Sequence, residues 1–318
     1  MKPVTWLFSG QGSQFYQMAR ELYDGDPVFR RELERGDAIV RPLLNVSLIE
    51  EIYRARADRF EPFRRVAFTH PALLMVEHAL AQMLFARGQR PERVAGHSLG
   101  EIAAFVVAGA IDFEAALTSV VKQGLVLEYL APRGAMMAVL APSELFAQEP
   151  ALFAGCELAG VVFGRSFVIG GPVAEVQAAR TRLKARQVDT YDLPVEHPFH
   201  TSAMASVKAP VMAALGGVTF GTPQIPVFSV AAAGLVAQPS AEHLWFATSS
   251  RTDFPAAVRA LEAGGPSIYV DLGPGGGLST TIKYTLPQGA ASELIPLVTM
   301  FGHESRNLER LATRLKTR

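Results

Sequence analysis

The sequence predicts an α/β fold that carries a small inserted lobe. Strand-like and helix-like segments alternate through 1–133, as they do in sheets whose strands are joined by helices. A Gly-x-Ser-x-Gly spacing at 96–100 is typical of a tight turn between a strand and a helix. Over 134–198 the order of elements changes and suits a ferredoxin-like α+β layer. We therefore expect a large subdomain at 1–133 and 199–318 and a ferredoxin-like small subdomain at 134–198.

The opening elements of the large subdomain follow from apolar periodicity. An apolar run at 4–9 indicates a buried strand, and a polar loop, Gly10-Gln11-Gly12-Ser13-Gln14, follows it. A short strand is expected at 93–95, before the serine turn. Asp112 is expected to cap the start of a helix, since its side chain can accept hydrogen bonds from the free backbone amides of the first turn. The predicted helices are 27–40, 71–86, 102–110 and 113–130.

The remaining elements divide at Pro198. The small subdomain is expected to contain strands at 135–140, 156–163, 166–169 and 188–193, with helices at 142–148 and 172–186. Beyond Pro198 the pattern of the large subdomain returns, with a strand at 225–230, a helix at 254–262, a strand at 267–271 and a glycine-rich turn at 273–277. An arginine-rich helix at 304–316 is expected to close the chain at the surface.

Composition excludes several classes of function. Thirty basic and thirty acidic residues give no net charge, so the overall balance favours neither nucleic acid nor a membrane surface as a partner. Cys156 is the only cysteine, which excludes an intramolecular disulfide and a cysteine-rich metal site. The first residues have no long apolar core of the signal-peptide kind, and the run at 102–111 is too short to span a bilayer. We expect a soluble protein of the cytoplasm without a metal.

Ser98 is the candidate nucleophile of the Gly-x-Ser-x-Gly turn. In such a turn the strand and helix backbones come close together, and Gly96 and Gly100 leave room where a Cβ would collide. The amides that open the following helix, beginning at Leu99, point toward negative charge developing on a substrate oxygen. The same spacing also occurs by chance in ordinary turns. The strand before it and the apolar helix after it favour the functional interpretation.

A serine nucleophile needs a base within hydrogen-bond reach, and histidine is the usual base because its pKa lies near working pH. Among the seven histidines, His97 adjoins Ser98 and is expected to brace the turn rather than deprotonate it. His78, His243 and His303 lie in segments without a recognisable motif. His197-Pro198-Phe199-His200 lies at the predicted return to the large subdomain, where a cleft between the lobes is expected.

Four segments together resemble a known family. They are Gly10-Gln11-Gly12-Ser13-Gln14, Gly96-His97-Ser98-Leu99-Gly100-Glu101, His197-Pro198-Phe199-His200 and Asp271-Leu272-Gly273-Pro274-Gly275. Their order is similar to that of malonyl-CoA:acyl carrier protein transacylases and the acyltransferase domains of polyketide synthases, and the likeness spans nearly the whole chain. It implies an α/β-hydrolase-like large subdomain and a two-step ping-pong exchange. It further implies that no cofactor is bound and that the substrates are carried on the phosphopantetheine of acyl carrier protein or on CoA.

The resemblance also implies roles for individual residues. Ser98 would be acylated, His200 would be the base held by backbone carbonyls, and the amides of Gln11 and Leu99 would form the oxyanion hole. The acyl pocket would include His70, His97, Phe199, Phe163 and Gln123. Three of its positions depart from the family pattern, since His70 and Ala247 replace usual glutamines and Phe163 lies near a usual asparagine.

Gln123 is the departure with the largest chemical consequence. Family members that load malonyl or methylmalonyl groups carry an arginine before a glycine in this helix, and here Gln123 precedes Gly124. A buried carboxylate without its counter-ion costs roughly 3 to 5 kcal/mol. Lys122 is about 100° away around the helix and is not expected to replace the arginine. The alternative is that Gln123 is an ordinary polar residue and that the clamp comes from elsewhere. His197-Pro198-Phe199-His200, in contrast, resembles the His-Ala-Phe-His form linked to malonyl.

We therefore expect an acyltransferase that moves a non-malonyl acyl group from a thioester donor to an acyl carrier protein in polyketide-type biosynthesis. An acyl-carrier-protein thioester hydrolase and a malonyl-CoA transacylase with an unusual pocket remain alternatives. A scaffold without catalysis is disfavoured by the intact Ser98, His200 and Gln11. Carrier proteins are usually acidic, so the basic residues expected to dock one are Arg165, Arg180, Arg182 and Arg186, although each also fits an ordinary solvated face.

Overall fold

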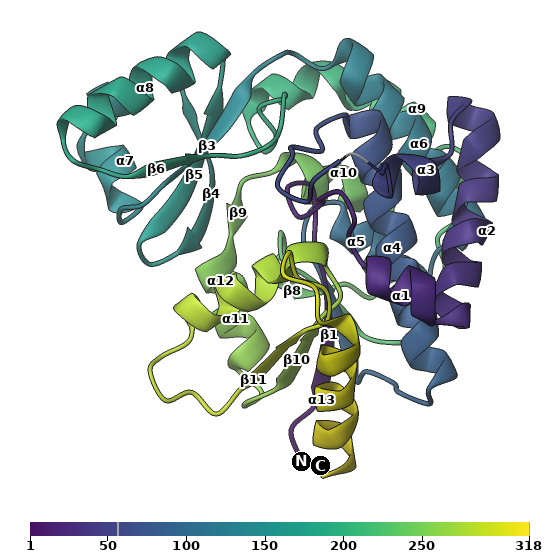
Figure 1. Cartoon of the computed structure of the whole chain (residues 1–318). Coiled ribbons are helices and arrows are strands. Elements are labelled where there is room, and N and C mark those ends of the chain that lie inside the picture. The colour runs from purple at the N-terminus through teal and green to yellow at the C-terminus, as the bar shows by residue number, and fades with distance from the viewer. Residues whose placement is uncertain (56, 318) are drawn as a thin grey trace.

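The strands form two separate sheets in different parts of the molecule (Figure 1). The computed structural model describes residues 1–55 and 57–317. A six-stranded sheet has the order β11-β10-β1-β2-β7-β8, and a five-stranded sheet has the order β6-β3-β5-β4-β9. This arrangement confirms the predicted α/β class with two subdomains.

The larger sheet is parallel except at one edge. Among the described residues, the pairing of β7 with β8 is the one antiparallel pairing of this sheet. Parallel neighbours need crossover connections, and the carboxyl ends of their strands meet at one edge, where sites of such sheets usually form. Its strands are β1 (Val4–Phe8), β2 (Arg93–Gly96), β7 (Val227–Ser229), β8 (Gly234–Leu235), β10 (Ile268–Asp271) and β11 (Glu293–Pro296).

Helices cover both faces of the larger sheet. Alternate residues of β1 explain this, because Trp6 belongs to one apolar cluster and Leu7 to the other. The cluster around Leu7 packs against α11 (Phe254–Glu262) and α12 (Gly277–Thr285). The cluster around Trp6 packs against helices that include α2 (Pro27–Leu44), α4 (Val66–Ala86), α5 (Gly100–Val107) and α6 (Phe113–Leu130). The remaining elements of this subdomain are α1 (Arg20–Gly25), α3 (Leu48–Ile52), α9 (Lys208–Ala214), α10 (Ala241–Ser249), α13 (Glu304–Lys316) and the short 3-10 turns at Ser202–Val207 and Pro274–Gly276.

The smaller sheet is antiparallel except for one added strand. Apolar residues on one of its faces form a core with α8 (Val173–Ala185). The other elements are β3 (Ala135–Val139), α7 (Glu144–Gln148), a 3-10 turn at Pro150–Phe153, β4 (Glu157–Phe163), β5 (Ser166–Gly171), β6 (Thr190–Asp192) and β9 (Thr252–Asp253). The strand β9 pairs in parallel with β4. Its residues lie in the segment that the sequence assigned to the large subdomain, so the small sheet recruits two residues from outside 134–198.

The predicted bounds of several helices differ from the observed ones, and the largest error is at the start of α4. The sequence placed the start of a helix at Pro71, the position where proline is usually tolerated, but α4 begins at Val66 and contains Pro71 in its interior. Nearly every residue of α4 is buried, including Val66, Ala67 and Phe68. The burial of this apolar segment therefore extends the helix past a residue that normally interrupts one. None of the helices in the described ranges is long and apolar enough to cross a membrane.

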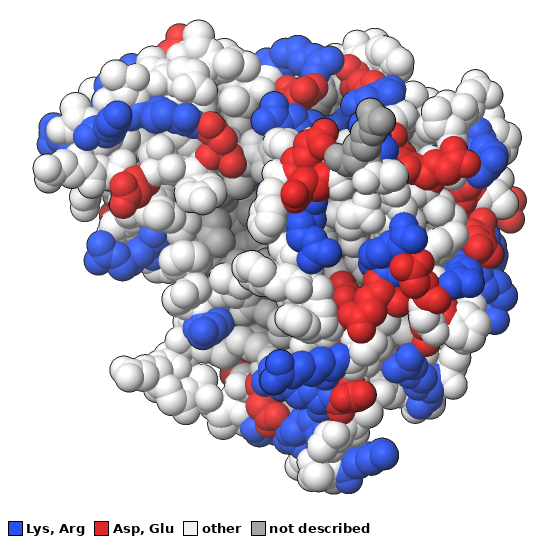
Figure 2. Space-filling view, viewed as in Figure 1, with Lys and Arg blue, Asp and Glu red and all other residues white. Residues whose placement is uncertain are grey.

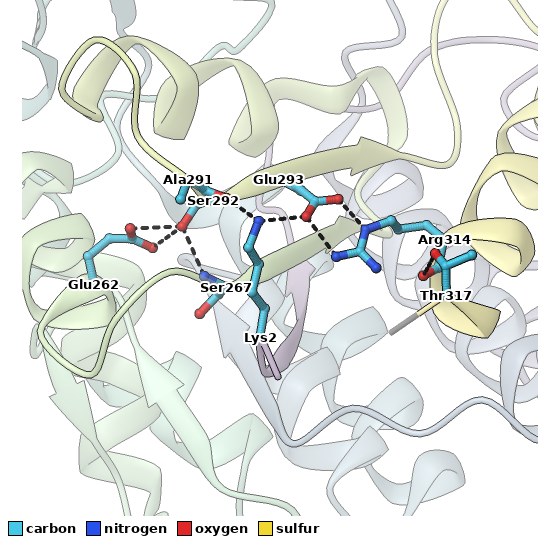
Figure 3. A network of polar contacts seen from close by, with 8 residues as sticks. All are labelled: Lys2, Glu262, Ser267, Ala291, Ser292, Glu293, Arg314 and Thr317. Carbon is cyan, nitrogen blue, oxygen red and sulfur yellow. Dashed lines mark hydrogen bonds and ion pairs between the residues drawn. The ribbon is translucent and has the colours of Figure 1, made fainter.

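A polar network joins the start of the chain to its last helix (Figure 3). Lys2 and Arg314 both contact the Glu293 carboxylate, with the Lys2 Nζ at 2.7 Å and the Arg314 Nη2 at 2.9 Å. These two cations lower the pKa of Glu293 to about 2. Beside them, the Ser292 hydroxyl donates to Glu262 and accepts from the Ser267 amide. The network thus links the starts of β1, β10 and β11 to α13.

Candidate functional site

The turn that carries Ser98 is held by two glycines. Ser98 has φ 55°, a left-handed conformation, between the end of β2 and the start of α5. A Cβ on Gly96 would lie 2.4 Å from the Glu101 Cα, and one on Gly100 would lie 2.2 Å from the Phe8 carbonyl oxygen. No larger residue fits at either position without a backbone shift. Left-handed backbone at a residue other than glycine is strained and is frequent at functional sites.

Ser98 lines a cavity between the two subdomains. Figure 2 shows the surface hollowed there, with charged residues mostly on the outer surface of both lobes. The cavity measures about 970 Å³, counting the part open to solvent. Within the described residues its lining contains no lysine, arginine, aspartate or glutamate. Its apolar wall comes from both subdomains and includes Leu127, Met136, Val168, Met204, Val211 and Trp245.

His200 lines the same cavity and has a defined tautomer. Its Nδ1 lies 2.7 Å from the Ser250 carbonyl oxygen. Because a carbonyl oxygen only accepts, Nδ1 carries the proton and Nε2 is left as the free base. Burial lowers the pKa of His200, and the bond to Ser250 opposes that shift. The imidazole is therefore neutral at neutral pH. Like Ser98, His200 has a left-handed backbone, with φ 60°.

The amides of Gln11 and Leu99 belong to residues that line this cavity. In the described part of the chain, neither amide donates to a protein acceptor, whereas the next amides of the turn, from Gly100 to Ile102, are all bonded within it. The backbone at Gly10 lies close to the serine turn, because a Cβ on Gly10 would lie 2.9 Å from the Ser98 Cβ. The Gln11 side chain accepts a hydrogen bond from Thr69 at 2.9 Å. Two free amides thus remain available to a substrate oxygen.

Three further predicted pocket residues, His70, His97 and Phe199, also line the cavity. The His97 ring lies 5.8 Å from the His200 ring, and the His70 ring lies 6.1 Å from the Phe199 ring. Burial lowers the pKa of both His70 and His97 to about 3, so both imidazoles are neutral. Their Nε2 atoms and the Nε2 of Gln11 are buried without a protein partner among the described residues.

Gln123 lies in the cavity wall and is 6% exposed. Its Nε2 donates to the Ser119 hydroxyl at 3.0 Å, one helical turn earlier. Lys122 lines a different hollow on the outer surface of the molecule, as the helical geometry predicts. The side chain that faces the cavity from this part of α6 is therefore a neutral amide.

Two sequence-based expectations about the pocket were wrong. Phe163 does not line the cavity, because Val162 takes that place and the Phe163 ring packs against Tyr284 at 5.2 Å. The register between β4 and β5 shifts twice in this segment. A simple alternation of side chains along β4 therefore does not predict which residues face the cavity. Ala247 is buried outside the lining, and the neighbouring Thr248 lines the cavity instead.

The arginines of the small subdomain have different surroundings. Arg182 donates to the carbonyl of Leu152 at 2.9 Å, which holds α8 against the preceding turn. Arg186 pairs with Glu149 at 3.0 Å, and Arg180 pairs with Asp192. Arg165 is exposed in the turn between β4 and β5. Among these four candidate docking residues, Arg165 is the one without an ion pair or hydrogen bond to another described residue.

The sequence did not identify a buried polar group behind Ser98. Glu101 is fully buried, and its carboxylate contacts the Ser229 hydroxyl and His243 Nε2, both at 2.7 Å. A charged residue in an apolar helix signals such a group, but its partners lie more than a hundred residues away in the chain. In the described ranges, no cluster of three or more histidine, cysteine, aspartate or glutamate side chains is suited to hold a metal.

Comparisons with known proteins agree over nearly the whole chain. Residues 5–317 match the model of the family described as acyl transferase domain. The chain is 33% identical over 307 residues to the polyketide biosynthesis acyltransferase homolog PksD of Bacillus subtilis, with 96% of this chain and 95% of the relative covered. It is 32% identical over 310 residues to the homolog BaeD of Bacillus velezensis, with 98% and 96% covered.

Solved structures show the same fold. A loading acyltransferase from the avermectin modular polyketide synthase aligns with a TM-score of 0.88 at 27% identity, covering 98% of this chain and 99% of that one. MCAT from Streptococcus pneumoniae aligns with a TM-score of 0.80 at 27% identity, covering 98% of this chain and 99% of that one. The similarity thus extends to both subdomains.

Proposed function

This chain belongs to the acyl transferase domain family, and on that premise we propose that it transfers an acyl group that bears no carboxylate. The donor is a thioester on coenzyme A or on an acyl carrier protein. The acceptor is the phosphopantetheine thiol of an acyl carrier protein. Two relatives that match along nearly their whole length are named for polyketide biosynthesis, which supports this setting.

The uncharged lining of the cavity carries the proposal. A carboxylate that enters a buried site needs a cation, and in the described residues no lysine or arginine lines this one. Gln123 supplies an amide already bonded to Ser119. Apolar side chains form most of the wall, and they favour an alkyl or aryl group. A neutral acyl chain therefore matches the cavity better than a malonyl group does.

In the proposed first step Ser98 attacks the thioester carbonyl carbon. His200 Nε2 accepts the Ser98 proton while Nδ1 remains bonded to the Ser250 carbonyl. The carbonyl oxygen becomes an oxyanion, which the amides of Gln11 and Leu99 stabilise. The carbon–sulfur bond then breaks, the thiolate takes the proton from His200, and the acyl group remains on Ser98 as an ester.

The second step reverses these roles with a new acceptor. The thiol of a carrier protein gives its proton to His200 and attacks the ester carbon. When the tetrahedral intermediate collapses, the Ser98 oxygen leaves and takes back the proton. The products are a new thioester and the free enzyme, so no cofactor is consumed.

Hydrolysis is the second candidate function, and one observation favours it. Three buried nitrogens in the lining, on Gln11, His70 and His97, have no protein partner in the described part of the chain. Buried polar groups of this kind are commonly satisfied by water, and a water at the ester would release a free acid. The same nitrogens also suit the oxygens of an acyl chain.

A discharge assay separates the two functions. The enzyme is loaded from butyryl-CoA, and either a holo acyl carrier protein or buffer alone is then added. We expect the carrier protein to gain the butyryl mass faster than butyrate appears in the buffer arm. Butyrate release at equal rates in both arms, without any acylated carrier protein, would establish hydrolysis instead.

A further inference from the structure

A fully buried carboxylate lies behind the serine turn and has no part in the steps above. Glu101 is on the first turn of α5, three residues after Ser98, and its own amide donates to the Ser98 carbonyl at 3.0 Å. One carboxylate oxygen accepts a hydrogen bond from the Ser229 hydroxyl at 2.7 Å. The other lies 2.7 Å from His243 Nε2. A buried carboxylate without hydrogen-bond partners raises the free energy of the folded state, so the loss of either contact is unfavourable.

His243 connects this carboxylate to the helix that ends beside the base. It lies in the first turn of α10, and its ring meets the Phe105 ring of α5 edge-on at 5.7 Å. The same helix places Trp245 and Thr248 in the cavity wall. It ends just before Ser250, whose carbonyl accepts from His200 Nδ1. One helix therefore carries the contact to Glu101 at its start and the carbonyl for His200 at its end.

We propose that Glu101 and His243 are positioning residues that fix α10, and with it the Ser250 carbonyl, relative to Ser98. The inference rests on the proposed function, because it assumes that Ser98 and His200 react together. The bonds form one continuous path, from the Ser98 carbonyl through Glu101 and His243 to α10, and from Ser250 to His200.

The geometry explains why this path affects the reaction rate. A helix of nine residues moves as a rigid unit, so a shift at His243 displaces the Ser250 carbonyl as well. That carbonyl is the hydrogen-bond partner that sets the His200 tautomer and ring orientation. A misplacement of reacting groups by about 1 Å costs on the order of 100-fold in rate. The pair acts through His200 and touches no substrate.

The test uses a fluorophosphonate, which labels an activated serine whatever its natural acyl group. Ser98 attacks phosphorus, fluoride leaves, and His200 takes the serine proton, so the labelling rate reports the pair of groups directly. His243→Leu removes the donor to Glu101. We expect its maximal labelling rate to fall about tenfold or more while the half-saturating probe concentration stays unchanged.

Three matched variants separate positioning from stability. His243→Gln keeps an N–H donor at a similar reach and is expected to recover most of the rate. Glu242→Gln, at the exposed neighbour that pairs with Lys208 at 3.1 Å, is expected to label like the unaltered protein. Leu311→Ala removes a buried contact in α13, far from α10, and lowers stability without slowing the labelling.

The outcomes are distinct. A wild-type labelling rate in His243→Leu, or an equally slow rate in His243→Gln, would overturn the positioning role. If His243→Leu does not fold, Glu101→Gln takes its place, because it keeps the shape while weakening the bond to His243, and it is expected to slow labelling in the same way. Absence of label on Ser98 in the unaltered protein would instead reject the proposed function.

Discussion

At the scale of single residues, Ser98 and His200 are held in place by two different kinds of contact, a glycine turn and a hydrogen bond to a backbone carbonyl. The glycines around Ser98 leave a pattern in the sequence because a local turn requires them. The carbonyl that holds His200 leaves none, since every residue has a carbonyl and Ser250 lies fifty residues along the chain. Glu101 ends the motif at 96–101, but its proposed positioning role depends on the contact with His243. No local pattern in the sequence indicated His243.

Gln123 gives the clearest prediction at this scale. Gln123→Arg would place a guanidinium in the wall of the cavity, where it can pair with the free carboxylate of a malonyl group. We expect the ratio of malonyl to butyryl loading to rise by about tenfold or more, as measured by competition between the two CoA thioesters.

The control for this variant is the neighbouring residue. Lys122→Gln changes a charge on the same helix but faces another hollow, so it should leave the ratio unchanged. An unaltered preference in Gln123→Arg would show that the amide at this position does not select the substrate.

At the scale of elements, three helices were predicted with their observed bounds, whereas the strands of two residues were not predicted. The helices at 113–130, 254–262 and 304–316 have the predicted bounds, and Asp112 caps the first of them as expected by accepting from Ala115 at 2.9 Å. The strands β8 and β9 have two residues each, too few for any alternation to appear. Their pairing depends on neighbours that are distant in the sequence.

Strand registry limited the prediction of the pocket. The strand at 156–163 was predicted, yet the irregular pairing of β4 decides that Val162 rather than Phe163 faces the cavity. A one-residue difference reverses the face of a strand. The sequence therefore indicated the correct element but the wrong side chain.

At the scale of the whole molecule, the cavity depends on both subdomains. Its wall combines Leu127 of α6, Met136 of β3 and Trp245 of α10, which are far apart in the chain. No local pattern reports that these side chains meet, so the uncharged lining became visible only in the folded structure. The substrate preference proposed here is accordingly a property of the assembled lobes rather than of Gln123 alone.

A second property of the whole molecule is its response to pH. Glu304 is buried at the start of α13, and its pKa is raised to about 7 by burial and by the neighbouring Glu21. In the unfolded chain the group titrates near 4.5. A raised folded pKa means that stability is lost as pH rises from the unfolded value through the folded one. We expect Glu304→Gln to be more stable at pH 8 by about 1 to 3 kcal/mol, and little changed at pH 4.

Denaturant unfolding at the two pH values measures this difference. Glu309→Gln, an exposed position on the same helix, provides the control and should show no comparable gain. A stability difference that does not grow with pH would contradict the assignment of this carboxyl group as a destabilising charge.

The central claim is that Ser98 carries a neutral acyl group as an ester within an uncharged cavity. The most direct measurement is the intact mass of the enzyme after mixing with butyryl-CoA or malonyl-CoA, with Ser98→Ala in parallel. We expect a butyryl adduct that Ser98→Ala abolishes, and a much smaller malonyl adduct. A butyryl adduct that persists in Ser98→Ala, or a dominant malonyl adduct on the unaltered protein, would contradict the central claim.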